Sequence, residues 1–161
     1  MSEDTLKSYI TLNGYGKLKE ELYNLVTKER PELVHIINWA ASNGDRSENG
    51  DYIYGKRKLR EVDKKIHYLT KKLENITVVD YTTHKHSPKI YFGATVEIFR
   101  NHKETLKVQI VGQDEINPSL NHISWNSPLA RALLGRQVGD EFNFKTPNGM
   151  DAIEITEVLY I

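Results

Sequence analysis

Residues 59–76 read LREVDKKIHYLTKKLENI, and the spacing of the apolar side chains in this stretch decides the fold of the first half of the chain. From residue 47 to residue 75 the only residues with a weak helix propensity are Gly50 and Gly55. The apolar residues recur at alternating intervals of three and four, which is the heptad pattern of a coiled-coil helix. They are Leu59, Val62, Ile66, Leu69, Leu73 and Ile76. The stretch therefore predicts one long helix with a single apolar edge.

A matching apolar edge lies upstream, in a helix predicted from Lys17 to Ser42. If the chain reverses between Gly44 and Arg46, the two edges meet as an antiparallel hairpin in one register. The pairs are then Leu18 with Leu73, Leu22 with Leu69, Leu25 with Ile66, Ile36 with Gly55, and Trp39 with Tyr52. Pro31 should bend the first helix, because proline removes a backbone hydrogen bond.

From about residue 82 the pattern changes to that of a small β-rich domain. Strands are predicted at residues 94–99, 105–111, 123–125, 141–145 and 152–160. A tight turn is predicted at Asn148-Gly149, and a short helix over Pro128–Leu134. The sequence thus predicts an α+β protein, with an N-terminal antiparallel coiled-coil hairpin (residues 1–81, tip around 44–52) followed by a small antiparallel sheet domain with one helix (residues 82–161).

Composition excludes several classes of protein. The 161 residues contain no cysteine, so the chain has neither disulfides nor thiolate metal sites. No apolar run is long enough to span a membrane, and the first residues lack the basic start and apolar core of a signal peptide. We therefore expect a cytoplasmic protein that does not associate with membranes.

The basic residues of the second predicted helix are concentrated along one side. Between Lys56 and Lys72 there are eight basic and two acidic residues, although the whole chain is balanced at 22 of each. Arg57, Arg60 and Lys64 follow helical spacing and form a stripe. This stripe is either a solvated face that pairs with glutamates of the first helix, or an electrostatic track for the phosphates of a single-stranded polynucleotide.

Three carboxylates lie at the predicted tip, each three residues from the next: Asp45, Glu48 and Asp51. One interpretation is structural, because Asp45 followed by Glu48 is similar to a capping box at the start of the second helix. The other is a metal site. Two or three exposed carboxylates are poor ligands for Mg²⁺ by themselves, so such a tip would complete a site whose other ligands belong to a partner.

The residues around this tip resemble the bacterial Gre transcript-cleavage (transcription elongation) factors, and the GreB subtype in particular. The resemblance rests on WAASNGDRSENGDY (39–52), KLREVD (58–63), YLTKKLEN (68–75), YFGA (91–94), SPLARALL (127–134) and VGD (138–140). It extends from about Ile10 to Ile161 without a long gap. Gly50 stands where we expect alanine, which should loosen the start of the second helix.

The resemblance implies an FKBP-like second domain that docks at the secondary channel of RNA polymerase. The hairpin would enter that channel and stimulate Mg²⁺-dependent cleavage of the 3′ end of backtracked RNA by the polymerase. The chain would then be an accessory factor and not an enzyme, a monomer that holds Mg²⁺ only jointly with the polymerase.

The resemblance also implies roles for individual residues. Asp45 and Glu48 would assist the metal, with Asp51 in support. The tip would be shaped by Arg46, Ser47, Asn49 and Tyr52. RNA would be contacted by Lys56, Arg57, Arg60 and Lys64, and polymerase by Ser127, Pro128 and Leu129.

Three other functions remain open from the sequence. The second domain could be a peptidyl-prolyl isomerase, because the implied fold also hosts that activity. The chain could be a module that enters the same channel and only blocks it, although such an inhibitor would not need both Asp45 and Glu48. It could also be a coiled-coil scaffold, for which changes at the tip would be harmless.

Overall fold

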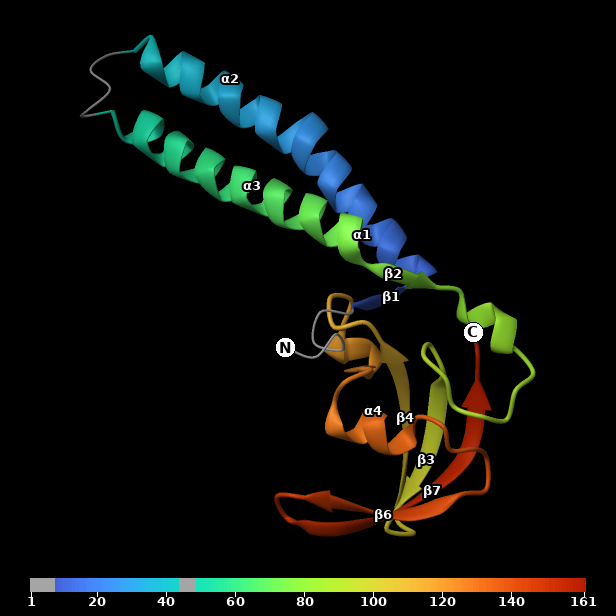
Figure 1. Cartoon of the computed structure of the whole chain (residues 1–161). Helices are drawn as coiled ribbons and strands as arrows, with labels where there is room; N and C mark the ends of the chain where they lie inside the picture. Colours follow the sequence, from blue (N-terminus) through green and yellow to red (C-terminus); the bar gives the residue numbers. More distant parts are fainter. Residues whose placement is uncertain (1–7, 44–48) are drawn as a thin grey trace, which may run out of the picture. The chain divides into compact units, whose positions relative to one another are not determined.

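A computed structural model describes residues 8–43 and 49–161 of the chain. They divide into two compact units: Tyr15–Ile76 form one, and residues 8–14 together with Thr77–Ile161 form the other. Figure 1 shows the first unit as a helical hairpin and the second as a curved sheet with a short helix. The residues just before Tyr15, which the sequence groups with the hairpin, pack within the sheet unit.

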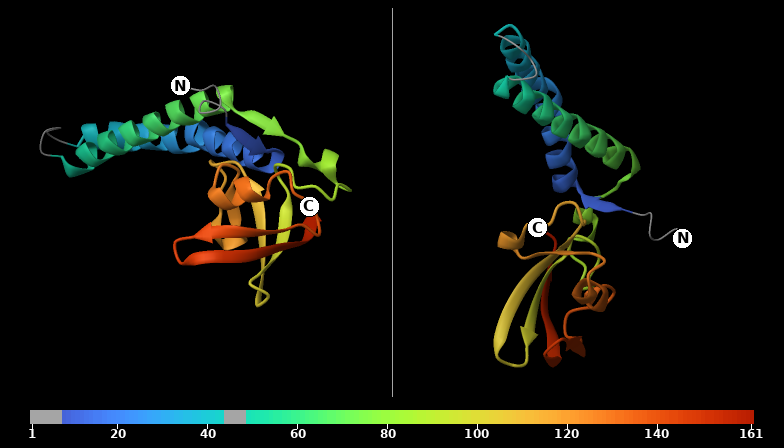
Figure 2. Two further views of the ribbon diagram at one scale, coloured as in Figure 1. Left: turned by 60° about the horizontal axis from the view of Figure 1, so that its bottom comes forward. Right: turned by 90° about the vertical axis from the view of Figure 1, so that its left-hand side faces the viewer.

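The helical unit is the predicted antiparallel hairpin (Figures 1 and 2). Its first arm contains α1 (Leu12–Asn24), a π-helical turn (Leu25–Glu29) and α2 (Arg30–Ala41), and its second arm is α3 (Gly50–Asn75). Leu25, Val62 and Leu69 are buried between the arms, and Leu18, Leu22, Leu33 and Ile66 pack against them. The predicted apolar edges therefore meet as expected.

The π-helical turn corrects the predicted register beyond Leu25. The backbone N–H of Arg30 donates to the carbonyl of Leu25, five residues back, so this turn holds one residue more than an α-helical turn. The turn ends two residues before Pro31, which has no N–H to donate. The extra residue places Ile37, not Ile36, opposite Gly55: a Cβ on Gly55 would lie 2.8 Å from Cγ1 of Ile37. Ile37 is buried, whereas Ile36 is 39% exposed.

The sheet unit contains a five-stranded sheet in the order β5-β4-β3-β7-β6. All neighbours in it are antiparallel except β4 and β5. The strands correspond to the five predicted runs: β3 (Thr95–Arg100), β4 (Glu104–Val111), β5 (His122–Ser124), β6 (Glu141–Thr146) and β7 (Gly149–Leu159). In the β6–β7 hairpin Thr146 pairs with Gly149, so the two turn residues are Pro147 and Asn148, one position earlier than predicted.

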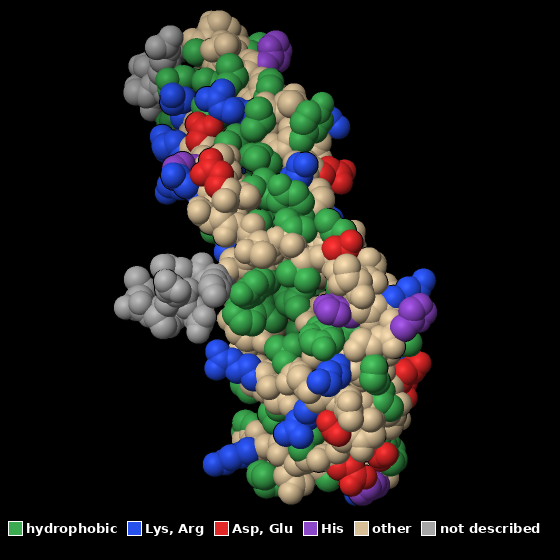
Figure 3. Space-filling view, turned by 45° about the vertical axis from the view of Figure 1, so that its right-hand side comes forward, with side chains coloured by type: hydrophobic (Ala, Val, Ile, Leu, Met, Phe, Trp, Pro, Cys, Tyr) green, Lys and Arg blue, Asp and Glu red, His purple; other side chains and the backbone are tan. Residues whose placement is uncertain are grey.

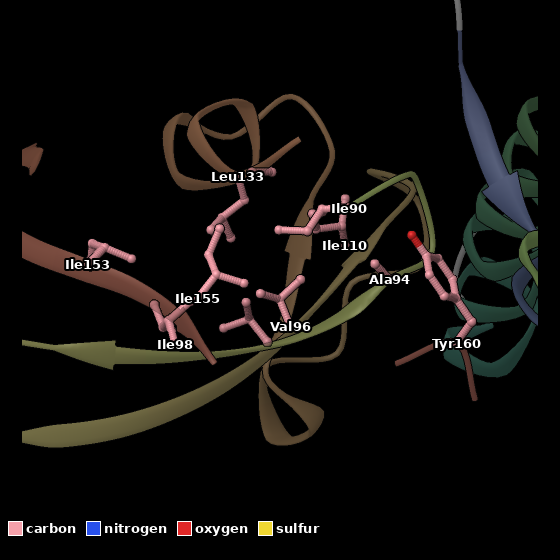
Figure 4. Close-up of a cluster of buried hydrophobic side chains, with 11 residues drawn as sticks. Ile90, Ala94, Val96, Ile98, Ile110, Leu133, Ile153, Ile155 and Tyr160 are labelled. Atoms are coloured by element: carbon pink, nitrogen blue, oxygen red, sulfur yellow. The ribbon is translucent and has the colours of Figure 1, made fainter. Parts of the chain in front are cut away.

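The core of this unit lies between one face of the sheet and α4 (Pro128–Leu133), as Figure 4 shows for Leu133 and the isoleucines around it. Ile90, Val96, Ile98, Ile110 and Ile155 are almost completely buried there. The α4 helix is capped as predicted, because Oγ of Ser127 accepts a hydrogen bond from the N–H of Ala130 at 3.2 Å. The α+β fold class is therefore confirmed, with one helix on a largely antiparallel sheet.

A second, two-stranded parallel sheet was not predicted. It pairs β1 (Tyr9–Thr11) with β2 (Thr77–Val79), and three residues are too few to show an alternating pattern. Beside it, the Glu115 carboxylate accepts hydrogen bonds from the N–H of Thr11 (2.8 Å), the hydroxyl of Thr11 and the N–H of Gly112 (2.9 Å). Thr11 itself caps α1, since its Oγ1 accepts from the N–H of Gly14.

The remaining elements are short 3₁₀ turns at Tyr81–His84 and Pro118–Leu120. The first falls at the predicted domain boundary near residue 82, and the ring of His84 stacks on that of Tyr91 with 4.2 Å between the ring centres. None of the helices in the described part of the chain is both long and apolar enough to cross a membrane.

Candidate functional site on the helical hairpin

Asn49 joins the two arms of the hairpin where they approach the tip. Its Oδ1 accepts a hydrogen bond from the N–H of Tyr52 at 3.1 Å, which caps the N-terminus of α3. Its Nδ2 donates to the carbonyl of Ala40 at 2.6 Å, at the C-terminal end of α2. One side chain thus satisfies a free donor at the start of α3 and adds a second hydrogen bond to a carbonyl at the end of α2, which also accepts from the N–H of Asn43 at 3.1 Å. It therefore links the end of α2 to the start of α3.

The hydrogen bonds of Asn49 show which residue caps α3, and this bears on the capping-box interpretation of the tip acids. The N-cap of α3 is Asn49, and the helix begins at Gly50. The capping-box interpretation, which assigned the cap to Asp45, is therefore wrong.

The structure describes some of the predicted tip residues and not others. Asp45, Arg46, Ser47 and Glu48 lie outside the described residues. Asp51 is exposed in the first turn of α3, where a negative charge suits the helix dipole, and Tyr52 is half-buried in the same turn. A Cβ on Gly50 would meet no atom within 4 Å, so alanine would fit at this position.

We predict that Asn49→Ala destabilises the hairpin by about 1–2 kcal/mol, because it removes the cap of α3 and leaves the Ala40 carbonyl without its side-chain donor. Thermal unfolding followed by circular dichroism measures the loss. Asn49→Asp is the matched control, since it keeps the capping oxygen and loses only the donor to Ala40. Equal melting temperatures of Asn49→Ala and the unchanged protein would contradict the role given to Asn49.

The predicted basic stripe lies on the exposed side of α3. Figure 3 shows lysine and arginine side chains gathered along one edge of the hairpin. The seam of α3 contains Gly55, Val62 and Leu69, which are buried. Helical spacing places the stripe about half a turn away from that seam, on the side that faces away from the first arm. Its members are Lys56, Arg57, Arg60 and Lys64, all exposed.

The ion pairs found among the described residues of the hairpin involve other cations than those of the stripe. Lys65 contacts Glu21 at 2.6 Å, Arg30 contacts Asp63 at 2.8 Å, and Lys58 contacts Glu61 at 3.6 Å. The hydrogen bond that Lys65 donates to Glu21, followed by the attraction of the Glu21 charge, raises the pKa of Lys65. Among the described residues, no carboxylate lies within ion-pair distance of the four stripe residues. The expected pairing with glutamates of the first helix is found for Lys65 with Glu21, whereas these four cations are exposed to solvent without such a pair among the described residues.

The three residues predicted to bind polymerase begin α4 in the sheet unit. Ser127 caps the helix, Pro128 is exposed at its first turn, and Leu129 is half-buried against the core. Ser127 and Leu129 thus have structural roles, and Pro128 is the residue of the three with the most accessible side chain.

The structure places Trp39 differently from the prediction. The sequence paired it with Tyr52 in the apolar seam, but the Trp39 side chain is 56% exposed and Ala40 is fully buried instead. The cause is again the π-helical turn, which rotates every later residue of the first arm. In the sequence, Pro31 is the only sign of this irregularity, and the apolar pattern of the first arm does not reveal the rotation.

No metal site is complete within the described ranges 8–43 and 49–161, where no three histidine, aspartate or glutamate side chains form a group that could hold an ion. Of the three carboxylates predicted to approach Mg²⁺, only Asp51 is described, and its exposed oxygens belong to the donor class that this ion prefers.

Comparison with known proteins gives two family matches that together span nearly the whole chain. Residues 8–78 match the model described as the transcription elongation factor N-terminal domain, and residues 84–160 match the C-terminal domain of transcription elongation factors GreA/GreB. The two matched ranges correspond closely to the hairpin and the sheet unit.

Individual relatives are similar over almost their full length. The protein named transcription elongation factor GreB from Neisseria meningitidis serogroup B is 54% identical over 161 residues, covering 100% of this chain and 98% of the relative. Proteins of the same name from Haemophilus influenzae (44%, covering 95% and 96%) and Vibrio cholerae (45%, covering 94% of each) follow. A solved GreA/GreB structure from Nitrosomonas europaea is 22% identical with a TM-score of 0.42, covering 96% of this chain and all of that one.

Proposed function

Since this chain belongs to the GreA/GreB family of transcription elongation factors, we propose that it enters the secondary channel of bacterial RNA polymerase and stimulates the polymerase's own cleavage of backtracked RNA. The predicted GreB-type membership is confirmed by the relatives of that name. In this proposal the chain is an accessory factor, a monomer located in the cytoplasm with the polymerase, and the RNA 3′ end is the segment that is removed.

The observation that carries the proposal is the basic stripe of α3, which no described carboxylate neutralises. Four cations on one side of a helix attract the phosphates of a single strand. At about 1.5 Å per residue, the 26 residues of α3 span roughly 39 Å. The stripe occupies roughly 12 Å of that length, mostly in the half of α3 that begins at Gly50, so the cations lie toward the tip end of the helix.

The proposed chemistry at the tip is electrostatic. Asp45 and Glu48 would hold Mg²⁺ jointly with polymerase carboxylates, and the bound ion would activate water for phosphodiester hydrolysis. Asn49 fixes the ends of the segment that carries both acids, because it bonds to α2 and α3 at once. Its role is to position the acids and not to contact the metal.

The direct test adds the protein to a stalled polymerase complex with labelled RNA, with and without Mg²⁺. We expect short 3′ fragments to be released only when the protein and Mg²⁺ are both present. Blocked cleavage would favour the channel-blocking module, and no effect on cleavage would overturn the proposal. A proline-isomerisation assay on the same protein tests the alternative enzyme, and we expect no activity.

The basic stripe gives a prediction about salt dependence. We predict that Arg57→Gln, Arg60→Gln and Lys64→Gln together reduce the slope of log affinity against log salt by about 2, because each phosphate contact to a single strand contributes roughly 0.7. Binding to polymerase complexes that contain backtracked RNA, measured over a range of salt concentrations, gives the slope.

The matched control changes two lysines of the same helix that already have acidic partners. Lys58→Gln with Lys65→Gln removes charges that pair with Glu61 and Glu21, so we expect the slope to remain unchanged. Equal slopes for the stripe variant and the unchanged protein would mean that the stripe does not contact RNA.

A further inference from the structure

A small pocket lies on the face of the sheet that points away from α4 and the core. It has a volume of about 260 Å³. In the sheet register Phe99, Glu154 and Glu141 stand side by side on β3, β7 and β6, strands that adjoin one another in Figure 1. They alternate with Ile153 and Ile155, whose side chains are buried in the core. Directly opposed residues share a face, so these three side chains project outward together.

The pocket exists because a small residue stands among larger ones. The next row of the same face contains Ala152 opposite Asn143, and the ring of His102 packs edge-on against Phe99 at 5.8 Å. Ala152 leaves a depression next to the row formed by Phe99 and the two glutamates, and His102 and Asn143 also line it. A volume below roughly 300 Å³ is less than a drug-sized ligand or cofactor needs, and it suits one long side chain.

The two glutamates have an unfavourable arrangement within the chain itself. Glu141 and Glu154 are directly opposite each other in an antiparallel pair, where like charges destabilise the sheet. In the described part of the chain neither carboxylate has a hydrogen-bond or ion-pair partner. The second such pair on this face, Glu97 with Glu157, is relieved by Lys107 at 3.9 Å from Glu97. Of these two pairs, the one at the pocket has no cation within ion-pair distance among the residues that the structure describes.

We propose that this pocket binds an arginine side chain of RNA polymerase, as a docking contact separate from the hairpin; the choice of partner rests on the function proposed above. A guanidinium group can bond to two carboxylates at once and stack on an aromatic face, which an ammonium group does less well. The chain already uses this chemistry nearby, where the guanidinium of Arg136 lies 4.1 Å from the ring centre of Phe142.

The first test compares two pairs of substitutions in polymerase binding. Glu141→Gln with Glu154→Gln should weaken the affinity for polymerase by about tenfold or more, because the arginine of the polymerase would then face two neutral amides in place of two negatively charged carboxylates. Cleavage at saturating factor should be unchanged, since the tip is intact. The control, Glu97→Gln with Glu157→Gln, should leave the affinity unchanged. Equal affinities of the pocket variant and the unchanged protein would overturn the proposal.

The second test does not depend on polymerase. N-acetyl-arginine amide, titrated into the unchanged full chain, should shift the nuclear magnetic resonance signals of Phe99 and Ala152. The same probe should not shift them in the Glu141→Gln/Glu154→Gln variant, and neither should the neutral citrulline analogue in the unchanged protein. Shifts with arginine but no effect of the protein on polymerase would preserve the arginine pocket and reject the proposed function. No shift with arginine would overturn the pocket.

Discussion

Stimulated RNA cleavage is expected to fall by about 100-fold or more when Asp45→Asn is combined with Glu48→Gln, while affinity for polymerase changes little. The amides keep the size and hydrogen-bonding capacity of the acids but remove the negative charge that attracts Mg²⁺. Because Asn49 and not Asp45 caps α3, the hairpin should remain folded. Fragment release from a stalled complex at saturating factor measures the effect.

Two further measurements make this result specific. Asp51→Asn removes a neighbouring charge on the first turn of α3 and should cause a smaller loss of cleavage. Circular dichroism of the double variant should show unchanged helix content. If cleavage by the double variant persists, the metal role of the two acids is wrong. If helix content falls instead, the acids support the fold, as the capping interpretation held.

Glu115→Ala is expected to lower the free energy of unfolding by about 3 kcal/mol. The Glu115 carboxylate accepts from two backbone N–H groups and one hydroxyl, and each buried donor left without a partner costs roughly 1–3 kcal/mol unless water reaches it. The corresponding decrease in melting temperature is about 6–12 °C for a chain of this size. Thermal unfolding measured by calorimetry gives the value.

Glu115→Gln serves as the control for this prediction. It keeps one carbonyl oxygen as an acceptor and nearly the same volume, so we expect a smaller loss than for alanine. A melting temperature of Glu115→Ala within a degree or two of the unchanged protein would show that the bonds to Thr11 and Gly112 contribute little.

The features that the sequence predicted correctly are those written in short-range patterns. The heptad spacing of the second arm identified the hairpin, and alternating apolar residues located all five strands of the larger sheet. The cap of α4 by Ser127 follows from local hydrogen bonding, as does the turn before Gly149 to within one residue. Each of these depends on neighbours a few positions apart, which the sequence displays directly.

The features that it missed depend on contacts between distant residues. The Asn49 side chain bonds to Ala40, and Glu115 bonds to Thr11 more than one hundred positions away. No local pattern marks an asparagine or glutamate for such a role. The π-helical turn beside Pro31 also adds one residue to the first arm, which changed the partner of Gly55 and exposed Trp39.

By itself, the sequence determined the helical hairpin, the strands of the larger sheet, the family and the chemical character of the tip and stripe, because residue type and spacing carry that information. Tertiary structure alone decided which cations of α3 form ion pairs and which residue caps that helix. It also decided that Glu141 and Glu154 lie opposite each other beside a pocket. These outcomes depend on distances of a few ångströms between side chains from different elements, and such distances exist only once the chain has packed.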